Sequence, residues 1–506
     1  MSAQPLAESL VQSVDWLAVA PPVIAAAVGL GVLVADLFLP EARKAVLGWV
    51  SVAGLAVAVL MLLPLLDGDR STFCLTGGAT RACSYTADHF TLVIQFLVLG
   101  GALLAALLSV TNLTDDQRRV PPGEFWFLLL SSAAGAALLP ASRDLATLIV
   151  ALEVASLPAF ALVGIRHGDE RSSEAALKFF LSSVTATAVS LMGISFVYAS
   201  TGTLYLTQVA QRLPHVGGQL HTLAQAGVVL TLIGFAFKTA AVPFHFWVPD
   251  TYVGAPLPVA AYLSVVGKAV GFSGLILVTV VAFPSYADVW GPALAALAAL
   301  TMTVGNVGAL RQQATRAYSA VRLLAWSSVG QAGYLLVPIA AAGYARDPQK
   351  AIGSTVAYAL MYGAVNLGAF AVAAVVGRSR ALNRISDYRG LYATNPLTAL
   401  LLAFFLLCLA GLPPGIIGLF AKVTVFSAAV DAGLGWLAVV MAVNVVIALF
   451  YYLQWTALLF RAPEGEPARH RVPAPLTAAL TLTGVLGVAL SGAPQLVLRF
   501  AATGLF

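Results

Sequence analysis

The sequence has few charged residues. Of its 506 residues only 10% are Asp, Glu, Lys or Arg, whereas 60% are hydrophobic. Soluble domains carry about 25% charged residues. Apolar runs of about 18 residues or more, long enough to cross a bilayer as helices, recur along the chain. This pattern excludes a soluble globular protein and predicts an all-α polytopic membrane protein. The net charge of +5 lies in loops, so it indicates topology and not nucleic-acid binding.

The sequence also lacks the motifs of enzymes that carry their own energy source. It has no GxxxxGK[ST] phosphate loop, no GxGxxG after a strand, no haem or iron–sulfur cysteine pattern and no histidine cluster for a metal. Its three cysteines are too few for a disulfide framework. Cys74 and Cys83 share one polar loop and either form a disulfide or remain two free thiols, whereas Cys408 lies in an apolar run. We therefore expect no cofactor and no metal in this chain, and a partner that supplies the energy.

The hydropathy pattern predicts fourteen membrane spans. Their approximate ranges are 17–39, 46–66, 90–112, 123–141, 144–165, 175–199, 223–248, 255–282, 290–310, 318–341, 351–376, 396–430, 433–460 and 474–498. Span 396–430 is too long for one straight crossing and contains the GLPPG run at 411–415, which predicts a broken helix. Pro243 predicts a second broken helix, the seventh.

The loops and the broken spans predict how the domain is organised. Lys and Arg are about twice as frequent in loops after odd-numbered spans as in the other loops, which predicts that both termini face outward. Each half has a proline-interrupted span with a lysine, which favours two inverted five-helix repeats, spans 4–8 and 9–13. We therefore expect one integral membrane domain over 1–506. Its parts would be three N-terminal spans in 1–122, a first repeat in 123–282, a second repeat in 290–460 and a last span in 474–500.

Lysine is scarce, and its distribution is uneven. Of only six lysines, four lie in apolar spans, namely Lys178, Lys238, Lys268 and Lys422, whereas the loops use arginine almost throughout. A charge at bilayer depth costs roughly 2.5–3.5 kcal/mol on insertion scales, so it usually has a function. Arginine keeps its proton, whereas a desolvated lysine can lose it. The four lysines therefore indicate proton transfer across the membrane.

Two further titratable residues extend this set. Glu153 lies midway through the fifth predicted span, and a short loop joins that span to the one with Lys178, so we expect a Glu153–Lys178 ion pair. His245 lies just beyond Pro243 and can relay protons near neutral pH. Simpler roles remain open: Glu153 as a packing anchor, Lys178 with its ammonium extended to the membrane interface, and His245 as a hydrogen-bonded core residue.

At these residues the sequence resembles the antiporter-like membrane subunits of respiratory complex I. Among them it is most similar to the subunit N branch of bacterial NADH–quinone oxidoreductase. The resemblance covers almost the whole chain and is carried by four segments: KTAAVPFHFWVPDTYVGAPLPVAAYLSVVGKAVGF, LLAWSSVGQAGYLL, GLPPGIIGLFAKVTVFSAAV and NVVIALFYYLQ.

This resemblance implies a proton-translocating subunit, driven by electron transfer from NADH to a quinone elsewhere in the complex. It implies that the proton-transfer residues are Glu153, Lys178, Lys238, His245, Lys268 and Lys422. NADH, FMN, the iron–sulfur clusters and the quinone would be bound by other subunits. The chain would lie in the bacterial cell membrane beside other antiporter-like subunits, joined through them to the peripheral redox arm.

Two departures from the family pattern concern the centre of the path. Val321 stands where many relatives have lysine, and Gln331 stands where many have histidine. We therefore expect the relay between Lys268 and Lys422 to depend on water. Three alternative functions remain: a subunit of a Mrp-type cation/proton antiporter, a stand-alone solute carrier and an inert membrane scaffold. The PDTYVGAP segment is evidence against the first of them.

Overall fold

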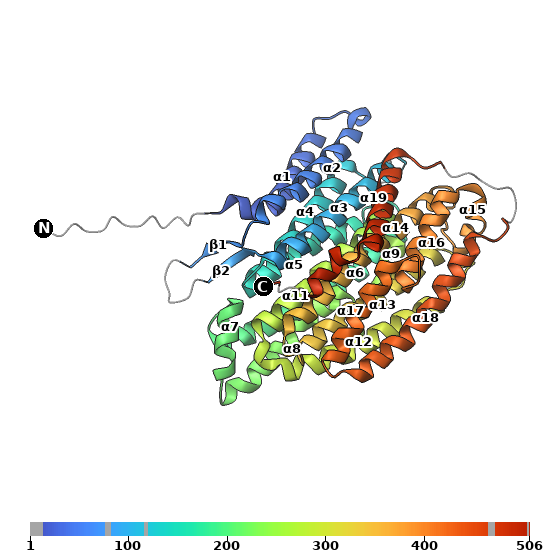
Figure 1. Cartoon of the computed structure of the whole chain (residues 1–506). Coiled ribbons are helices and arrows are strands. Elements are labelled where there is room, and N and C mark those ends of the chain that lie inside the picture. The colour runs from blue at the N-terminus through green and yellow to red at the C-terminus, as the bar shows by residue number, and fades with distance from the viewer. Residues whose placement is uncertain (1–13, 76–81, 116–119, 464–470, 503–504) are drawn as a thin grey trace.

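The computed structural model of the chain describes residues 14–75, 82–115, 120–463, 471–502 and 505–506. These residues form a bundle of long helices with one small hairpin at its end (Figure 1). Thirteen helices among them are long and apolar enough to cross a membrane. The predicted span 396–430 is occupied by two shorter helices, α16 (Pro396–Ala410) and α17 (Ile416–Asp431). All fourteen predicted spans are therefore helical, and the prediction of an all-α membrane protein is confirmed.

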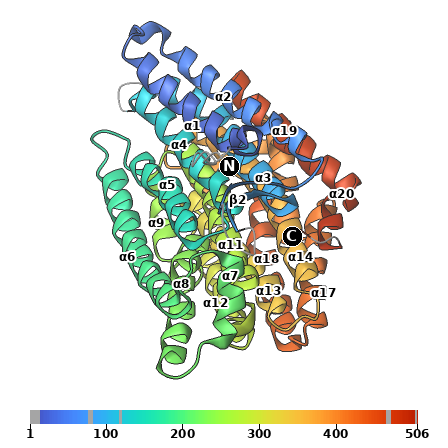
Figure 2. The same ribbon diagram turned by 90° about the vertical axis from the view of Figure 1, so that its left-hand side faces the viewer.

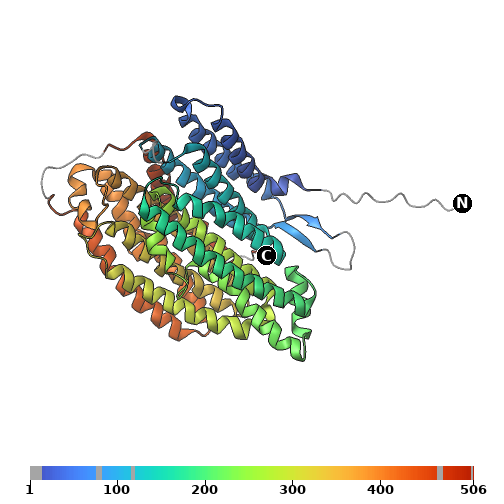
Figure 3. The same cartoon turned by 180° about the vertical axis from the view of Figure 1, so that it is seen from behind.

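The N-terminal part packs along one flank of the bundle, beside α4 (Figures 1 and 3). Its elements are α1 (Trp16–Asp36), α2 (Ala45–Leu60), β1 (Arg70–Cys74), β2 (Cys83–Ala87) and α3 (His89–Asp115). The elements that follow, the first half below, are α4 (Pro122–Leu138), α5 (Leu145–Val163), α6 (Glu170–Thr201), α7 (Leu206–Arg212), α8 (Gln219–Thr239), α9 (Trp247–Gly254), α10 (Leu257–Tyr262) and α11 (Lys268–Ile276).

The second half begins with the long helix pair α12 and α13. Its elements are α12 (Ala287–Leu310), α13 (Ser319–Ala342), α14 (Pro348–Ser379), α15 (Leu391–Thr394), α16, α17 and α18 (Gly435–Leu459), followed by the C-terminal helices α19 (Ala474–Gly492) and α20 (Gln495–Leu498). Figure 2 shows α6 at one edge of the bundle and α17 towards the opposite edge. The helices that carry the predicted functional lysines therefore extend across the width of the molecule.

Small residues let the helices of each half approach closely. A Cβ atom added to Gly193 of α6 would lie 2.4 Å from the Thr231 nitrogen of α8. A Cβ atom added to Gly305 of α12 would lie 2.2 Å from the Gly330 nitrogen of α13. Apolar side chains gain little from leaving lipid for protein, so close backbone packing at small residues is a main source of helix association in membranes. These contacts fix α8 and α13, which carry much of the candidate site.

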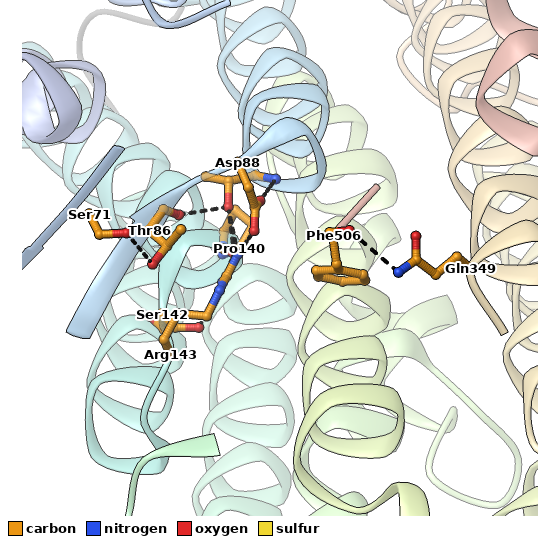
Figure 4. A network of polar contacts seen from close by, with 9 residues as sticks. Ser71, Thr86, Asp88, Pro140, Ser142, Arg143, Gln349 and Phe506 are labelled. Atoms are coloured by element: carbon orange, nitrogen blue, oxygen red, sulfur yellow. Dashed lines mark hydrogen bonds and ion pairs between the residues drawn. The ribbon is translucent and has the colours of Figure 1, made fainter. Parts of the chain in front are cut away.

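The start of α1, the hairpin and the C-terminal residues lie at the same end of the bundle. Arg70 of β1 pairs with Asp15 at 3.0 Å, and Arg143, just before α5, pairs with Asp88 after β2 (Figure 4). At this end the Gln349 amide also donates to the Phe506 carbonyl at 3.4 Å (Figure 4). The start of α1, the loops after the second, fourth and tenth spans and the C-terminal residues therefore make polar contacts at this end.

The hairpin was not predicted from the sequence. Strands β1 and β2 are antiparallel, and Cys74 lies opposite Cys83, with which it forms a disulfide with an S–S distance of 2.01 Å. Of the two possibilities for these cysteines, the structure has the bonded one. Cys408 is buried and unbonded in α16.

Candidate functional site

Lys238 lies in the last turn of α8, directly before the break in the seventh span. Ala240 has a left-handed backbone with φ of 68°, which ends the helix three residues before Pro243. The Lys238 side chain is only 3% exposed, and within the described residues its Nζ makes no hydrogen bond. Its Nζ lies 5.3 Å from the ring centre of Phe160 and 5.0 Å from that of Phe179. Aromatic faces attract a cation but do not accept its protons as a hydrogen-bond acceptor would, so these ring contacts leave the N–H groups of Lys238 unbonded.

Helices of the second half pack against the broken segment that follows Lys238. The backbone N–H of Val242 donates to the Thr301 hydroxyl of α12 at 2.9 Å, so a group freed by the break is satisfied inside the protein. His245 lies between α8 and α9, and its ring centre is 5.5 Å from that of Trp326 on α13. Its buried Nδ1 makes no hydrogen bond to any described residue. The structure thus places His245 where the two halves meet.

The expected ion pair between Glu153 and Lys178 is not formed. Glu153 accepts a hydrogen bond from the Thr187 hydroxyl of α6 at 2.7 Å, and it also acts electrostatically on Lys238. Lys178 pairs instead with Glu174 at 2.7 Å and with Asp250 at 2.9 Å. Because Thr187 is nine residues from Lys178 on the same helix, the two levels differ by about 13 Å along the axis. The sequence does not predict this offset, because it depends on the axial position of α6 relative to α5 in the folded protein.

Lys268 begins α11, immediately after a π-helical segment at Leu263–Gly267. It is 2% exposed, and its Nζ has no hydrogen-bond partner in the described part of the chain. A Cβ atom on Gly271 would lie 2.4 Å from the Thr239 nitrogen, so α11 packs directly on the end of α8 that carries Lys238. The π segment was not predicted. One turn before the lysine it contains Ser264, whose carbonyl accepts from the Tyr362 hydroxyl at 2.9 Å.

Lys422 of α17 is also 3% exposed, but it has partners. Its Nζ donates to the Leu409 carbonyl at 2.8 Å and to the Ala410 carbonyl at 2.7 Å, at the end of α16. The last carbonyls of a helix have no partner within that helix and carry partial negative charge, so a lysine there is favourable. On another side the ammonium lies 5.5 Å from the ring centre of Tyr334 on α13.

Between Lys268 and Lys422 the chain has a cluster of buried hydroxyl and amide groups. The Gln331 amide donates to the Tyr452 hydroxyl at 3.2 Å, and the Gln331 carbonyl oxygen accepts from Tyr358. Tyr452 also bonds the Ser327 hydroxyl at 2.5 Å, and Ser328 bonds Tyr362 at 2.8 Å. These tyrosines were not predicted as part of the site, although tyrosines inside apolar spans were the available signal.

Val321 and Gln331, the two positions that depart from the family pattern, have no group that titrates near neutral pH. Val321 lies beside a cavity of about 480 Å³ that is also lined by Tyr252 and Arg378. Gln331 holds hydroxyl groups in place, but a carboxamide has no proton to release near neutral pH. Among the described residues no group of three or more His, Cys, Asp or Glu side chains could hold a metal ion.

Comparison with known proteins identifies the family of the chain. Residues 142–448 match the family model described as "NADH:quinone oxidoreductase/Mrp antiporter, TM". The chain is 75% identical over 515 residues to NADH-quinone oxidoreductase subunit N 2 of Streptomyces griseus, an alignment that covers 99% of this chain and 96% of that relative. The chain belongs to the subunit N family of NADH-quinone oxidoreductases.

Solved structures show the same fold in a chain of respiratory complex I and in a chain of a Mrp complex. A chain of respiratory complex I from Thermus thermophilus superposes with a TM-score of 0.75 at 32% identity, covering 96% of this chain and 100% of that one. A chain of the Mrp complex from Dietzia gives a TM-score of 0.80 at 22% identity over 96% of each chain, a likeness that shows the shared fold alone. The resemblance seen in the sequence is therefore confirmed.

Proposed function

We propose that the chain is a proton-translocating membrane subunit of NADH–quinone oxidoreductase. Three lysines on three different helices carry the proposal: Lys238, Lys268 and Lys422 are 3%, 2% and 3% exposed. A buried charge is expensive in a bilayer and is usually kept for ion or proton movement. The redox chemistry would take place in other subunits, which bind NADH, FMN, iron–sulfur clusters and the quinone. This chain would contribute only proton-carrying side chains.

The packing supports an order of transfer from the first half to the second. Lys238 would exchange its proton with Lys268, because Gly271 brings their helices into direct contact. From Lys268 the proton would pass along the hydroxyl groups around Ser327 and Tyr452 to Lys422. Water would carry the proton past Gln331, because its carboxamide does not release a proton. Glu153 would set the charge near Lys238. His245 would exchange protons at the junction of the two halves.

Lys268 offers a direct test of the proposed path. In membrane vesicles that contain the whole complex, Lys268→Met slows proton movement through this subunit by about tenfold or more, because the central carrier is lost, and the number of protons moved per NADH oxidised falls by this subunit's share. The matched control is Lys350→Met, which removes a 64%-exposed lysine and leaves pumping unchanged. Proton uptake and NADH oxidation are measured on the same vesicles. Normal pumping by Lys268→Met would contradict the path.

A Mrp-type cation/proton antiporter is the second candidate, because the Dietzia structure shares the fold. The two functions differ in their partners. A complex I subunit co-purifies with quinone-reducing activity, whereas an antiporter subunit exchanges cations without it. A stand-alone solute carrier would transport when the purified chain alone is placed in liposomes.

We place the chain in the bacterial cell membrane with both termini on the outer side. The basic loops support this orientation, and so does the disulfide, which is stable on an oxidising side. The first residues, 1–13, lie outside the described part of the chain. We also propose that the halves are inverted repeats: α6 and α14 each have 32 residues, and each precedes a broken span that carries a buried lysine.

The hairpin cysteines test this orientation. In intact cells a membrane-impermeant thiol reagent should label the chain only after reduction of the Cys74–Cys83 disulfide. The double variant Cys74→Ser, Cys83→Ser should stay unlabelled, because Cys408 is buried. Labelling that occurs only in inverted vesicles would place the hairpin in the cytoplasm.

A further inference from the structure

Two buried hydroxyl groups on one face of α6 join this helix to the helices on either side of it. Thr187 and Ser190 are three residues apart, so their side chains lie on the same face, and they are 8% and 0% exposed. The Thr187 hydroxyl donates to Glu153 Oε1 of α5 at 2.7 Å. The Ser190 hydroxyl donates to the Thr231 carbonyl of α8 at 3.0 Å. One face of α6 therefore bonds both the acid of α5 and the backbone of α8.

Ser190 takes part in the backbone hydrogen bonding of α8. Its oxygen accepts from the Gly234 N–H at 2.7 Å, while its hydroxyl donates to Thr231. The lack of a side chain at Gly234 permits this approach, because a Cβ atom there would lie 2.5 Å from Ser190 Oγ. Gly234 lies four residues, about one helical turn, before Lys238. Ser190 therefore fixes to α6 the part of α8 from which the Lys238 side chain extends.

The same two helices, α5 and α6, surround the Lys238 ammonium. Its Nζ lies 5.3 Å from the ring centre of Phe160, which is on α5 like Glu153, and 5.0 Å from that of Phe179, which is on α6 like Thr187. Within the described residues this ammonium makes no hydrogen bond, and Glu153 is the acid that acts on it electrostatically. The attraction between two charges in a poorly hydrated interior depends strongly on their separation. The position of Glu153 therefore matters for the charge on Lys238.

We propose that Thr187 is a positioning residue that holds the Glu153 carboxylate at a fixed place relative to Lys238, while Ser190 fixes α8 to the same face of α6. The inference rests on the proposed function, in which Lys238 exchanges a proton. Glu153 makes no ion pair with any described residue, so the Thr187 hydroxyl is the contact that selects its rotamer. Without that hydroxyl the carboxylate is free to adopt other rotamers, and its attraction for Lys238 changes.

The test removes the Thr187 hydroxyl and keeps the size of the side chain. In vesicles with the whole complex, Thr187→Val slows proton movement through this subunit by about two- to tenfold, because the charge beside Lys238 is misplaced, and the protons moved per NADH fall by part of this subunit's share. Thr187→Ser keeps the hydroxyl and restores most of the pumping. The matched control is Thr185→Val: Thr185 is exposed and donates to the Leu181 carbonyl of its own helix, so pumping stays normal. Normal pumping by Thr187→Val overturns the inference.

A double variant separates this positioning role from a merely structural one. Because Thr187 acts through Glu153, the double variant Thr187→Val, Glu153→Gln pumps like Glu153→Gln alone, whereas effects that multiply would overturn the inference. If Thr187→Val fails to assemble, Thr187→Ala removes the same hydroxyl, and normal pumping by that variant overturns the inference too. Lys238→Ala is measured alongside: normal pumping there contradicts the proposed function, whereas a defect there with normal pumping by Thr187→Val contradicts this inference alone.

Discussion

Replacing Lys238 with alanine in the assembled enzyme slows proton movement through this subunit by about tenfold or more, because proton transfer loses its first buried carrier, and the protons moved per NADH fall by this subunit's share. The side chain is 3% exposed, and among the described residues its ammonium faces the rings of Phe160 and Phe179 and is influenced by the charge of Glu153. No described hydrogen bond to the ammonium is lost in the variant, so the complex should still assemble. Proton uptake by inverted vesicles, divided by NADH oxidation, gives the ratio.

Lys238→Arg is the decisive control for this prediction. Arginine keeps the positive charge and also interacts well with the faces of Phe160 and Phe179, so the packing is retained. It does not give up its proton at physiological pH, so proton transfer should stop. We expect Lys238→Arg to assemble normally and to pump as poorly as Lys238→Ala. Normal pumping by the arginine variant would mean that Lys238 is only a structural charge.

The membrane spans could be predicted from the sequence because long apolar runs have few alternatives in a bilayer. The break in span 396–430 was predicted by the GLPPG run, and α16 and α17 end and begin on either side of it. The seventh span also breaks as predicted, but at Ala240 and not at the proline. The π segments at Leu263–Gly267 and Leu277–Ala282 were missed, because an apolar helix in π form has no sequence signal.

The candidate site was predictable as a set of residues but not as a set of contacts. Lys238, Lys268 and Lys422 are buried, in keeping with their place in apolar spans. The partner of Lys178 was predicted wrongly, because the choice between Glu153 and Asp250 depends on the axial offset of α6 and on the fold of α9. The hydroxyl cluster around Gln331 joins α13, α14 and α18. These contacts could not be predicted, because the residues are far apart in the sequence and meet only in the folded protein.

Replacing Lys422 with methionine should have two effects, because this lysine has two roles. Methionine fills a similar space but cannot donate to the carbonyls of Leu409 and Ala410. Each buried carbonyl left without a partner costs about 1–3 kcal/mol, so less complex should assemble. In the complex that does assemble, proton movement through this subunit should be about tenfold slower, because the carrier of the second half is missing, and the protons moved per NADH should fall by this subunit's share. Immunoblots of membranes give the amount, and vesicle assays give the ratio.

Lys422→Arg separates these two roles. The guanidinium can still donate to both carbonyls at the end of α16, so assembly should return towards normal. Its proton stays bound, so pumping should remain as low as in the methionine variant. If the arginine variant instead restored pumping together with assembly, Lys422 would serve only to cap the end of α16. The proton would then have to leave the second half by another residue. After Lys422 releases one proton, its neutral amine keeps two N–H donors, which are enough for both carbonyls, so the end of α16 can stay capped while the proton leaves.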